Sequence, residues 1–192
     1  MKVLSAKQPF AYLLCAGIKD IENRTWPLPE KYKNEWVLIH AGADRKLNLM
    51  ALTREQYNNA CDKFDWNGAM KPVDQWPRSS IIGAVKFTDC VINHPSIWAQ
   101  KGFIEKTFVR KYSLGVEKKP IYNWVVSKAI LSKKPILNVK GRLGFWDYPA
   151  EMIVCPECGK ICLHSGEGIS QYVHNCEHCG FWITESDYET VK

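Results

Sequence analysis

Two pairs of cysteines near the carboxyl end constrain the fold of this chain more than any other feature of its sequence. Cys155 and Cys158 are separated by two residues, as are Cys176 and Cys179, and a glycine follows each pair. This C-x2-C…C-x2-C spacing is typical of zinc ribbons, in which four thiolates close a tetrahedron around one metal ion. We therefore expect a small zinc ribbon over residues 152–192, with these four cysteines as ligands of a structural Zn²⁺.

The same segment leaves alternatives open, because it holds four further side chains that bind metals: Cys162, His164, His174 and His178. One of them could replace a cysteine ligand or bind a second metal, although positions on the surface or behind the ligands are the more ordinary role. A redox role is a second alternative, because a single C-x-x-C pair can act as a thiol switch. Two pairs at ribbon spacing disfavour that role, so zinc remains the expectation.

The start of the chain and its eight cysteines bear on the compartment. Lys7, Gln8 and Pro9 interrupt the stretch where a signal peptide needs continuous apolar sequence, and no run approaches the roughly 18 apolar residues of a membrane span. We expect a protein of the cytoplasm, or of the nucleus in a eukaryote, that has no membrane partner. Thiols stay reduced there, which favours metal binding over disulfides.

Charge is distributed unevenly along the chain. The net charge is +6, but residues 153–192 carry two basic and six acidic side chains, which leaves +10 on residues 1–152. A basic domain favours a polyanionic partner, since phosphate neutralisation dominates nucleic-acid affinity. A solvated surface would account for the excess equally well. The acidic ribbon suits a protein partner better than DNA, which makes a protein-interaction scaffold one of the functional hypotheses.

The pattern of apolar residues predicts a domain made mostly of strands. We expect strands at 2–6, 20–26, 35–41, 80–92, 121–131 and 136–146, a helix at 10–14 that Gly17 ends, and a second helix at 47–64. Gly83 should allow a bulge in its strand, and 95–113 fits neither pattern clearly. Because strand follows strand without regular helical crossovers, we expect an α+β fold over residues 1–151, a mostly antiparallel β-barrel with flanking helices.

Ordered motifs within residues 2–149 support a more specific interpretation. They are Gln8-Pro9-aromatic, Gly17-x-Lys19-x-x-Glu22-x-Arg24, Leu38-Ile39-His40-Ala41, Gly83-x-Val85, Tyr122-x-Trp124 and Lys140-Gly141-x-Leu143-Gly144-Phe145-Trp146. In these motifs the chain resembles the ASCH domain family, relatives of PUA and EVE domains. The resemblance implies a PUA-like β-barrel, with a helix near its mouth and a cleft lined by the GxKxxExR run.

The chemistry of that run can also be read directly. In an extended segment, Glu22 and Arg24 point to the same face, and Lys19 lies just beyond the turn at Gly17. A cation, a carboxylate and a guanidinium so close together could orient one another, hold a phosphate or read the edge of a base. An ion pair that merely closes the barrel is the competing interpretation.

Aromatic side chains among the basic segments complete the candidate ligand site. Stacking of a base on an aromatic ring is worth about 1–3 kcal/mol, although most large aromatics in a small barrel belong to the core, and a histidine between Ile39 and Ala41 is often structural. The candidate ligand-binding residues are Gln8, Lys19, Glu22, Arg24, Trp26, His40 and Trp124. Their expected ligand is RNA, another single-stranded nucleic acid or a modified nucleotide.

An enzyme is the main alternative, because similar domains hydrolyse the acyl amide of N4-acetylcytidine or cleave RNA. The family's lysine matches Lys19, but Glu22 stands where those amidohydrolases have a threonine that acts with it. In a hydrolase the catalytic residues would be Lys19 and Glu22, the latter as a general base if its surroundings raise its pKa. Thr25 should point to the opposite face, and Glu105 is one candidate for the further glutamate that the family uses.

Overall fold

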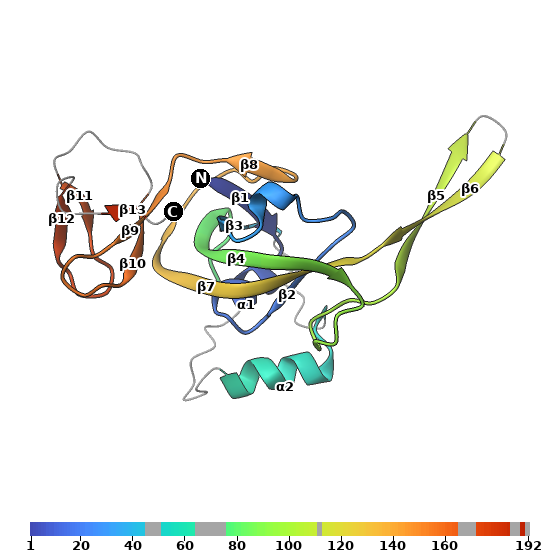
Figure 1. Ribbon diagram of the computed structural model, residues 1–192, viewed down its shortest axis with the longest axis horizontal. Helices are drawn as coiled ribbons and strands as arrows, with labels where there is room; N and C mark the ends of the chain where they lie inside the picture. Colours follow the sequence, from blue (N-terminus) through green and yellow to red (C-terminus); the bar gives the residue numbers. More distant parts are fainter. Residues whose placement is uncertain (45–50, 64–75, 111–112, 165–171, 185–188, 191–192) are drawn as a thin grey trace.

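The main body of the protein is one curled, six-stranded sheet with few helices (Figure 1). The computed structural model describes residues 1–44, 51–63, 76–110, 113–164, 172–184 and 189–190. The strands follow the order β2-β7-β4-β3-β1-β8, with bounds Ile21–Arg24, Tyr122–Ile136, Ser80–Ile92, Trp36–Ala41, Lys2–Ala6 and Phe145–Asp147. Only β1 and β3 of this sheet pair in parallel. The sheet therefore confirms the predicted β-rich α+β fold class, as a half-barrel.

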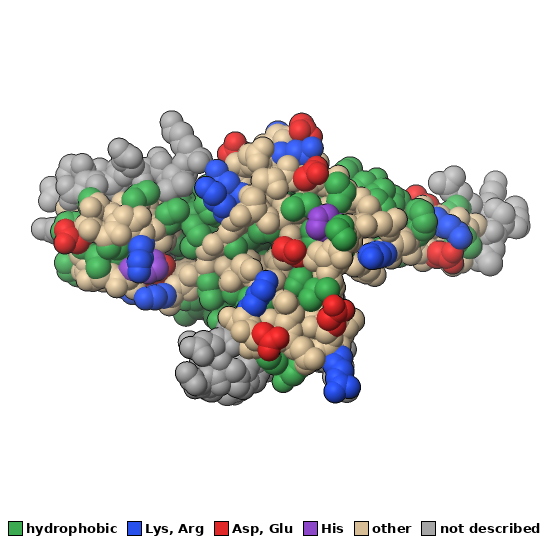
Figure 2. Space-filling view, turned by 60° about the horizontal axis from the view of Figure 1, so that its bottom comes forward, with side chains coloured by type: hydrophobic (Ala, Val, Ile, Leu, Met, Phe, Trp, Pro, Cys, Tyr) green, Lys and Arg blue, Asp and Glu red, His purple; other side chains and the backbone are tan. Residues whose placement is uncertain are grey.

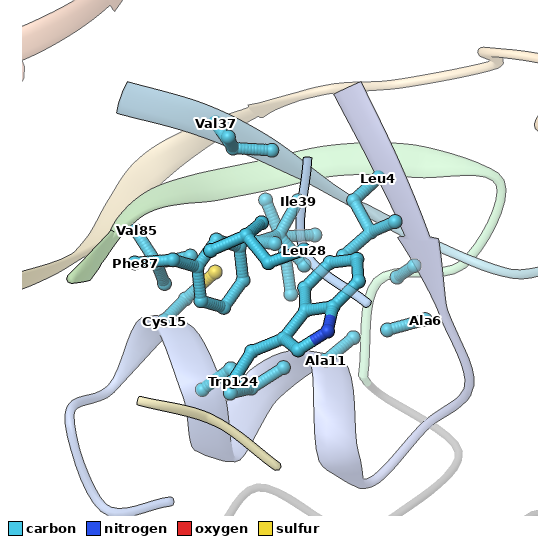
Figure 3. Close-up of a cluster of buried hydrophobic side chains, with 13 residues drawn as sticks. Leu4, Ala6, Ala11, Cys15, Leu28, Val37, Ile39, Val85, Phe87 and Trp124 are labelled. Atoms are coloured by element: carbon cyan, nitrogen blue, oxygen red, sulfur yellow. The ribbon is translucent and has the colours of Figure 1, made fainter. Parts of the chain in front are cut away.

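Helix α1 (Phe10–Cys15) packs inside the curl of the sheet. Gly83 makes this possible, because a Cβ there would lie 2.0 Å from the Ile130 carbonyl oxygen and 3.0 Å from Cys15 Sγ. The register between β4 and β7 shifts next to Gly83, which confirms the predicted bulge. Figure 3 shows the cluster that fills the curl, in which Trp124 and Phe87 are fully buried.

Helix α2 (Arg54–Lys63) lies outside the sheet (Figure 1). Residues 47–50 and 64 of the predicted helix lie outside the described residues. The helix begins only after Thr53, whose hydroxyl oxygen accepts a hydrogen bond from Gln56 N at 3.2 Å, while Gln56 Oε1 accepts one from Thr53 N at 3.1 Å. This reciprocal capping box fixes the start of the helix. A 3-10 turn, η1 (Glu30–Tyr32), precedes β3.

The predicted strand at 136–146 is mostly wrong. β7 runs on to Ile136, residues 137–144 form a loop, and only Phe145–Asp147 pair as β8. The backbone turns at Asn138 and Gly144, whose φ angles are +59° and +66°, and neither value is compatible with a strand. The alternating apolar residues of this segment thus mark a loop over the sheet.

The segment left unassigned between 95 and 113 contributes to a long hairpin. β5 (Phe103–Arg110) and β6 (Ser113–Pro120) pair only with each other among the described strands. In Figure 1 this hairpin, which we call the arm, projects away from the half-barrel at the end opposite the ribbon.

The cysteine-rich segment forms two small sheets at the other end of the molecule (Figure 1). One contains β9 (Glu151–Val154), β10 (Ile161–His164) and β13 (Glu189–Thr190), and the other contains β11 (Tyr172–Asn175) and β12 (Trp182–Thr184). The predicted boundary between 151 and 152 thus lies one residue inside β9.

This segment packs directly on the half-barrel. Met152 and Leu163 join a buried cluster with Leu38 and Trp146 of the large sheet. Glu177 Oε2 adds two hydrogen bonds, accepting them from the Ser132 hydroxyl at 2.9 Å and from Lys134 N at 2.8 Å. The cysteine-rich segment is therefore joined to the half-barrel by both apolar and polar contacts.

No helix in the part of the chain that the structure describes is long and apolar enough to span a membrane.

Candidate functional site

The four predicted cysteine ligands come together in the carboxyl-terminal segment. The sulfurs of Cys155, Cys158, Cys176 and Cys179 all lie within 4.8 Å of one another. Cys155 Sγ is 3.7 Å from Cys179 Sγ, and Cys158 Sγ is 3.7 Å from Cys176 Sγ. Tetrahedral zinc with Zn–S bonds of about 2.3 Å places its sulfurs about 3.8 Å apart, so the four thiols fit a Zn²⁺ ion.

Each cysteine pair sits in a tight turn closed by a glycine. Gly159 N donates to the Cys155 carbonyl at 2.8 Å, and Gly180 N donates to the Cys176 carbonyl at 2.9 Å. Both glycines have positive φ, +67° and +80°, which favours glycine over any other residue. Burial would raise the pKa of Cys176, but the backbone amides of Cys179 and His178 outweigh it and lower this pKa to about 6. The second turn thus favours the thiolate at Cys176. Burial raises the pKa of Cys155, and for Cys179 the Phe181 amide lowers the pKa but burial and the neighbouring thiols outweigh it and raise this pKa to about 12.

Two of the alternative ligands lie near this centre but have other contacts. Cys162 Sγ is 3.5 Å from Cys176 Sγ, yet Cys162 is not one of the four side chains that are mutually close enough to share an ion. His178 Nε2 is 3.2 Å from the Ile161 carbonyl oxygen and 3.6 Å from Glu177 Oε1. Among the described residues, the metal-binding group therefore consists of the four cysteines alone. The side chain of His174 lies outside the described residues.

A cavity of about 470 Å³ is lined by the GxKxxExR run. Gly17 ends α1 with a φ of +70°, after which Lys19 folds back and β2 presents Glu22 and Arg24. Lys19 Nζ lies 2.8 Å from Glu22 Oε2 and also donates to the Ile21 carbonyl. Arg24 Nη2 lies 2.9 Å from Glu22 Oε1. The three charged side chains form one ionic trio with a net charge of +1.

The trio is held largely out of water. The side chains of Lys19, Glu22 and Arg24 are 3%, 8% and 20% exposed. Burial would raise the pKa of Glu22, but the charges of Lys19 and Arg24 outweigh it and hold this pKa below its ordinary value. Glu22 is therefore a carboxylate at neutral pH, and the raised pKa that a general base at this position requires is not found.

A second cavity of about 670 Å³ adjoins the first, since both are lined by Ser5, Gly42 and Leu143. Its wall is the loop 137–144, from which Lys140 and Arg142 project as exposed cations. Leu143 is 99% exposed at the boundary of the two cavities. We refer to the two adjoining cavities together as the cleft, whose rim carries cations and one fully exposed apolar side chain.

Backbone contacts fix the loop 137–144 over His40. His40 Nε2 lies 2.9 Å from the Val139 carbonyl oxygen, and Val139 N donates to the Ser79 carbonyl at 2.7 Å. Gly141 presses on the imidazole so closely that a Cβ there would be 2.4 Å from His40 Cε1. Burial lowers the pKa of His40, partly offset by the hydrogen bond to Val139. A neutral imidazole that donates from Nε2 is therefore the expected state.

Ser5 links the two parts of the cleft. Its carbonyl accepts a hydrogen bond from Arg24 Nη2 at 2.8 Å, and its hydroxyl donates to the Arg142 carbonyl at 2.9 Å. Trp146 Nε1 donates to the same hydroxyl at 3.3 Å. The ionic trio and the loop are thus held in a fixed relative position by one residue of β1.

Four of the seven predicted ligand-binding residues line this cleft. Lys19, Glu22 and Arg24 line the first cavity, and His40 lies beneath the loop at the second.

The other three of the predicted residues have structural contacts. Trp124 is fully buried in the core, where its Nε1 donates to the Trp26 carbonyl at 3.3 Å and the two rings meet edge to face at 4.6 Å. Gln8 is buried, with Nε2 donating to the Pro77 carbonyl at 2.9 Å and Oε1 accepting from Tyr12 N at 3.1 Å. These side chains shape the half-barrel rather than line either cavity.

Sequence reasoning missed several residues of the cleft. Ser5 carries no signal, because a serine in a short strand gives no hint of three hydrogen bonds to distant residues. Arg142 and Leu143 lie in a segment that was predicted to be a strand. Gln100 lies in the stretch that fitted no pattern, and it lines the first cavity. The glycines on either side of Arg142 and Leu143 were the available sign of a loop.

Comparison with known proteins adds no family to this description. No protein-family model matches the chain, and no curated protein is significantly similar to it. The resemblance to ASCH domains therefore stays a prediction drawn from the motifs.

Proposed function

We propose that this chain is a nucleic-acid-binding protein with a PUA-like domain of the ASCH type, which holds RNA, another single-stranded nucleic acid or a modified nucleotide in the cleft around Lys19, Glu22 and Arg24. The observation that carries the proposal is the buried ionic trio, which lines a cavity that adjoins a second one edged by Lys140 and Arg142. A structural zinc ion in the carboxyl-terminal ribbon completes the proposed protein.

The trio suits recognition of an anion with polar edges. Glu22 shares its two oxygens between Lys19 and Arg24, so the three side chains are locked before a ligand arrives. A group held in place by its neighbours loses little freedom on binding, which favours affinity. The net positive charge and the exposed Lys7 at the edge of the cavity would attract phosphate.

Binding without catalysis is favoured over hydrolysis by the state of Glu22. A general base must take up a proton during the reaction, and a carboxylate paired with two cations is a weak base. An aromatic side chain beside the trio also favours binding, because Phe10 lines the first cavity and its ring centroid lies 5.6 Å from Lys19 Nζ.

Fluorescence anisotropy with labelled oligouridylate at several salt concentrations tests the proposal. We expect wild-type protein to bind with an affinity that falls steeply with salt, and Lys19→Ala and Arg142→Ala to weaken binding. Arg142 is exposed, so its removal should leave folding intact. Lys160→Ala, which removes an exposed cation from the ribbon, is the matched control. Binding that ignores both salt and these substitutions would rule out the cleft.

Incubation with N4-acetylcytidine and with labelled RNA, with and without divalent metal, separates a reader from an enzyme. We expect no product in either case. Turnover that Glu22→Gln abolishes would replace the binding proposal with the hydrolase.

The ribbon offers a separate surface for a protein partner. It is acidic overall, and Trp182 and Phe181 are 61% and 38% exposed on it. An acidic surface with exposed aromatic rings suits a basic protein partner. A partner that copurifies with wild-type protein, but not with Trp182→Ala, would support this second role.

A further inference from the structure

Among the described residues, the arm formed by β5 and β6 contributes no side chain to the buried clusters of the half-barrel or to the lining of either cavity. Among the described strands, each strand of the arm pairs only with the other, and the hairpin reaches away from the body (Figure 1). An isolated two-stranded hairpin is marginally stable in water. A projecting hairpin with exposed apolar side chains therefore indicates an interaction surface.

The root of the arm is fastened to the wall of the first cavity. Gln100, two residues before Gly102, lines that cavity together with Asn23. Gln100 N donates to Asn23 Oδ1 at 2.9 Å, and the Gln100 carbonyl accepts from Asn123 Nδ2 at 3.0 Å. Asn123 Nδ2 also donates to Asn23 Oδ1 at 2.9 Å. This network fixes the position from which the arm leaves the cleft.

The arm is basic. Counted with the two residues that precede β5, it spans residues 101–120 and contains six lysine and arginine residues and two glutamates, a net charge of +4. The glutamates are already paired, Glu105 with Lys118 at 2.9 Å and Glu117 with Lys119 at 3.4 Å. The excess positive charge therefore includes the exposed Lys101 and Lys106. A surface of this charge complements a polyanion.

The arm also exposes apolar and aromatic groups beside these cations. Phe103, Ile104 and Val116 are 64%, 41% and 55% exposed. In Figure 2 hydrophobic side chains gather where the arm leaves the body, with charged side chains farther out. Phe103 is the first residue of β5, and it follows Gln100, which lines the first cavity, by three positions in the chain. Aromatic rings among cations are the usual means of binding single strands without sequence preference.

We propose that the arm is a second contact surface for the same nucleic-acid strand, which leaves the first cavity past Gln100 and continues along β5 and β6. Phe103 stacks on a base next to the cleft, and Lys101 and Lys106 contact phosphates. This inference rests on the proposed function. The eight residues of β5 span about 27 Å, which is long enough to follow several nucleotides of an extended single strand.

The test compares labelled oligouridylates of four and twenty nucleotides by fluorescence anisotropy over a range of salt. Wild-type protein should bind the longer strand more tightly. Phe103→Ala should weaken binding of the long strand by roughly tenfold. Lys101→Ala/Lys106→Ala should reduce the salt slope for the long strand by about 1.4, or about 0.7 per lysine. The double variant Lys31→Ala/Lys160→Ala removes two charges from outside the arm. Its salt slope for the long strand should be closer to that of wild type than the slope of Lys101→Ala/Lys106→Ala is.

The failures of the two proposals can be told apart. Arm variants that bind the long strand like wild type, while Lys19→Ala still weakens binding, would overturn the arm and leave the cleft standing. If the arm variants lose binding while Lys19→Ala binds like wild type, the cleft proposal is overturned and the arm proposal stands. A second copy of the chain is the other possible occupant. Sedimentation velocity showing that Phe103→Ala dissociates a dimer, with unchanged affinity for the long strand, would also overturn this inference.

Discussion

The ammonium of Lys19 lies 2.8 Å from a carboxylate oxygen of Glu22, and both side chains are more than nine-tenths buried. The other carboxylate oxygen is 2.9 Å from Arg24. Removing one partner of such a pair leaves an uncompensated charge away from water, which costs far more than the pair contributes. The trio therefore belongs to the folding of the half-barrel as well as to the cleft.

Of the two single substitutions Glu22→Gln and Lys19→Met, Glu22→Gln should lower the free energy of unfolding more, by about 3–5 kcal/mol, because it leaves two cations without their shared carboxylate. Lys19→Met should cost less, since Arg24 still pairs with Glu22. In the double variant the two effects should be less than additive, because each change relieves part of the other. Urea unfolding of the four proteins gives the coupling free energy, and strictly additive costs would show that the pair is not an energetic unit.

Pure protein should contain about one zinc ion per chain, measured by atomic emission. Cys155→Ser should lose the metal, because a structural site needs all four thiolates to close its tetrahedron. Cys162→Ser is the matched control. It removes a buried cysteine beside the centre that is not one of the four, so the zinc content should not change. Retention of zinc by Cys155→Ser would exclude the four-cysteine site.

Glu177→Ala should weaken the attachment of the ribbon to the half-barrel. The substitution removes one acceptor of the Ser132 hydroxyl and of Lys134 N. Both donors keep a second partner, Ser132 Oγ with the Lys134 carbonyl and Lys134 N with Ser132 Oγ, so each lost hydrogen bond should cost only about 1 kcal/mol. Limited proteolysis should cut this variant faster than wild type between residues 147 and 155. Glu157→Ala, at an exposed position of the same ribbon, should be cut at the wild-type rate.

Because of His40, the protein should be less stable in mild acid than at neutral pH. Burial lowers its pKa below the ordinary value of 6.5. The unfolded chain therefore takes up a proton below about pH 6.5 that the folded chain resists, so stability is lost as the pH falls through this range. His40→Gln should show a smaller fall in Tm between pH 7.5 and pH 5.5. Zinc content measured at both pH values separates this effect from loss of metal, and equal falls in the two proteins would contradict it.

Local patterns predicted much of the half-barrel. The alternating or β-branched runs at 2–6, 35–41 and 80–92 became β1, β3 and β4, and Gly17 ended α1 as expected. These elements are determined by side-chain periodicity and by glycine, which act over a few residues. The segment 136–146 was misread, because its loop is held by contacts with Ser5, His40 and Ser79 that lie far away in the sequence.

The predicted aromatic ligand-binding residues also show that local sequence patterns do not reveal contacts between distant parts of the chain. Trp26 and Trp124 are aromatic residues near basic segments, and no local pattern distinguishes a ring that stacks on a base from one that fills a core. The structure makes that distinction, since Trp124 is fully buried while Phe103 is 64% exposed on the arm. Which aromatic faces solvent depends on where the sheet curls, and the curl depends on Gly83 and α1 together.

By itself, the sequence determined the four-cysteine group and the spacing of Lys19, Glu22 and Arg24, because both depend on residues close together in the chain or on a ligand spacing typical of zinc ribbons. Only the tertiary structure decided that the trio is buried, that a loop completes a second cavity beside it, and that a basic arm starts at the same edge. These features arise where segments about 75 to 140 residues apart meet, such as Asn23 with Gln100 and Ser5 with Arg142. Such contacts are set by the packing of the whole sheet, which leaves no periodic signal in the sequence.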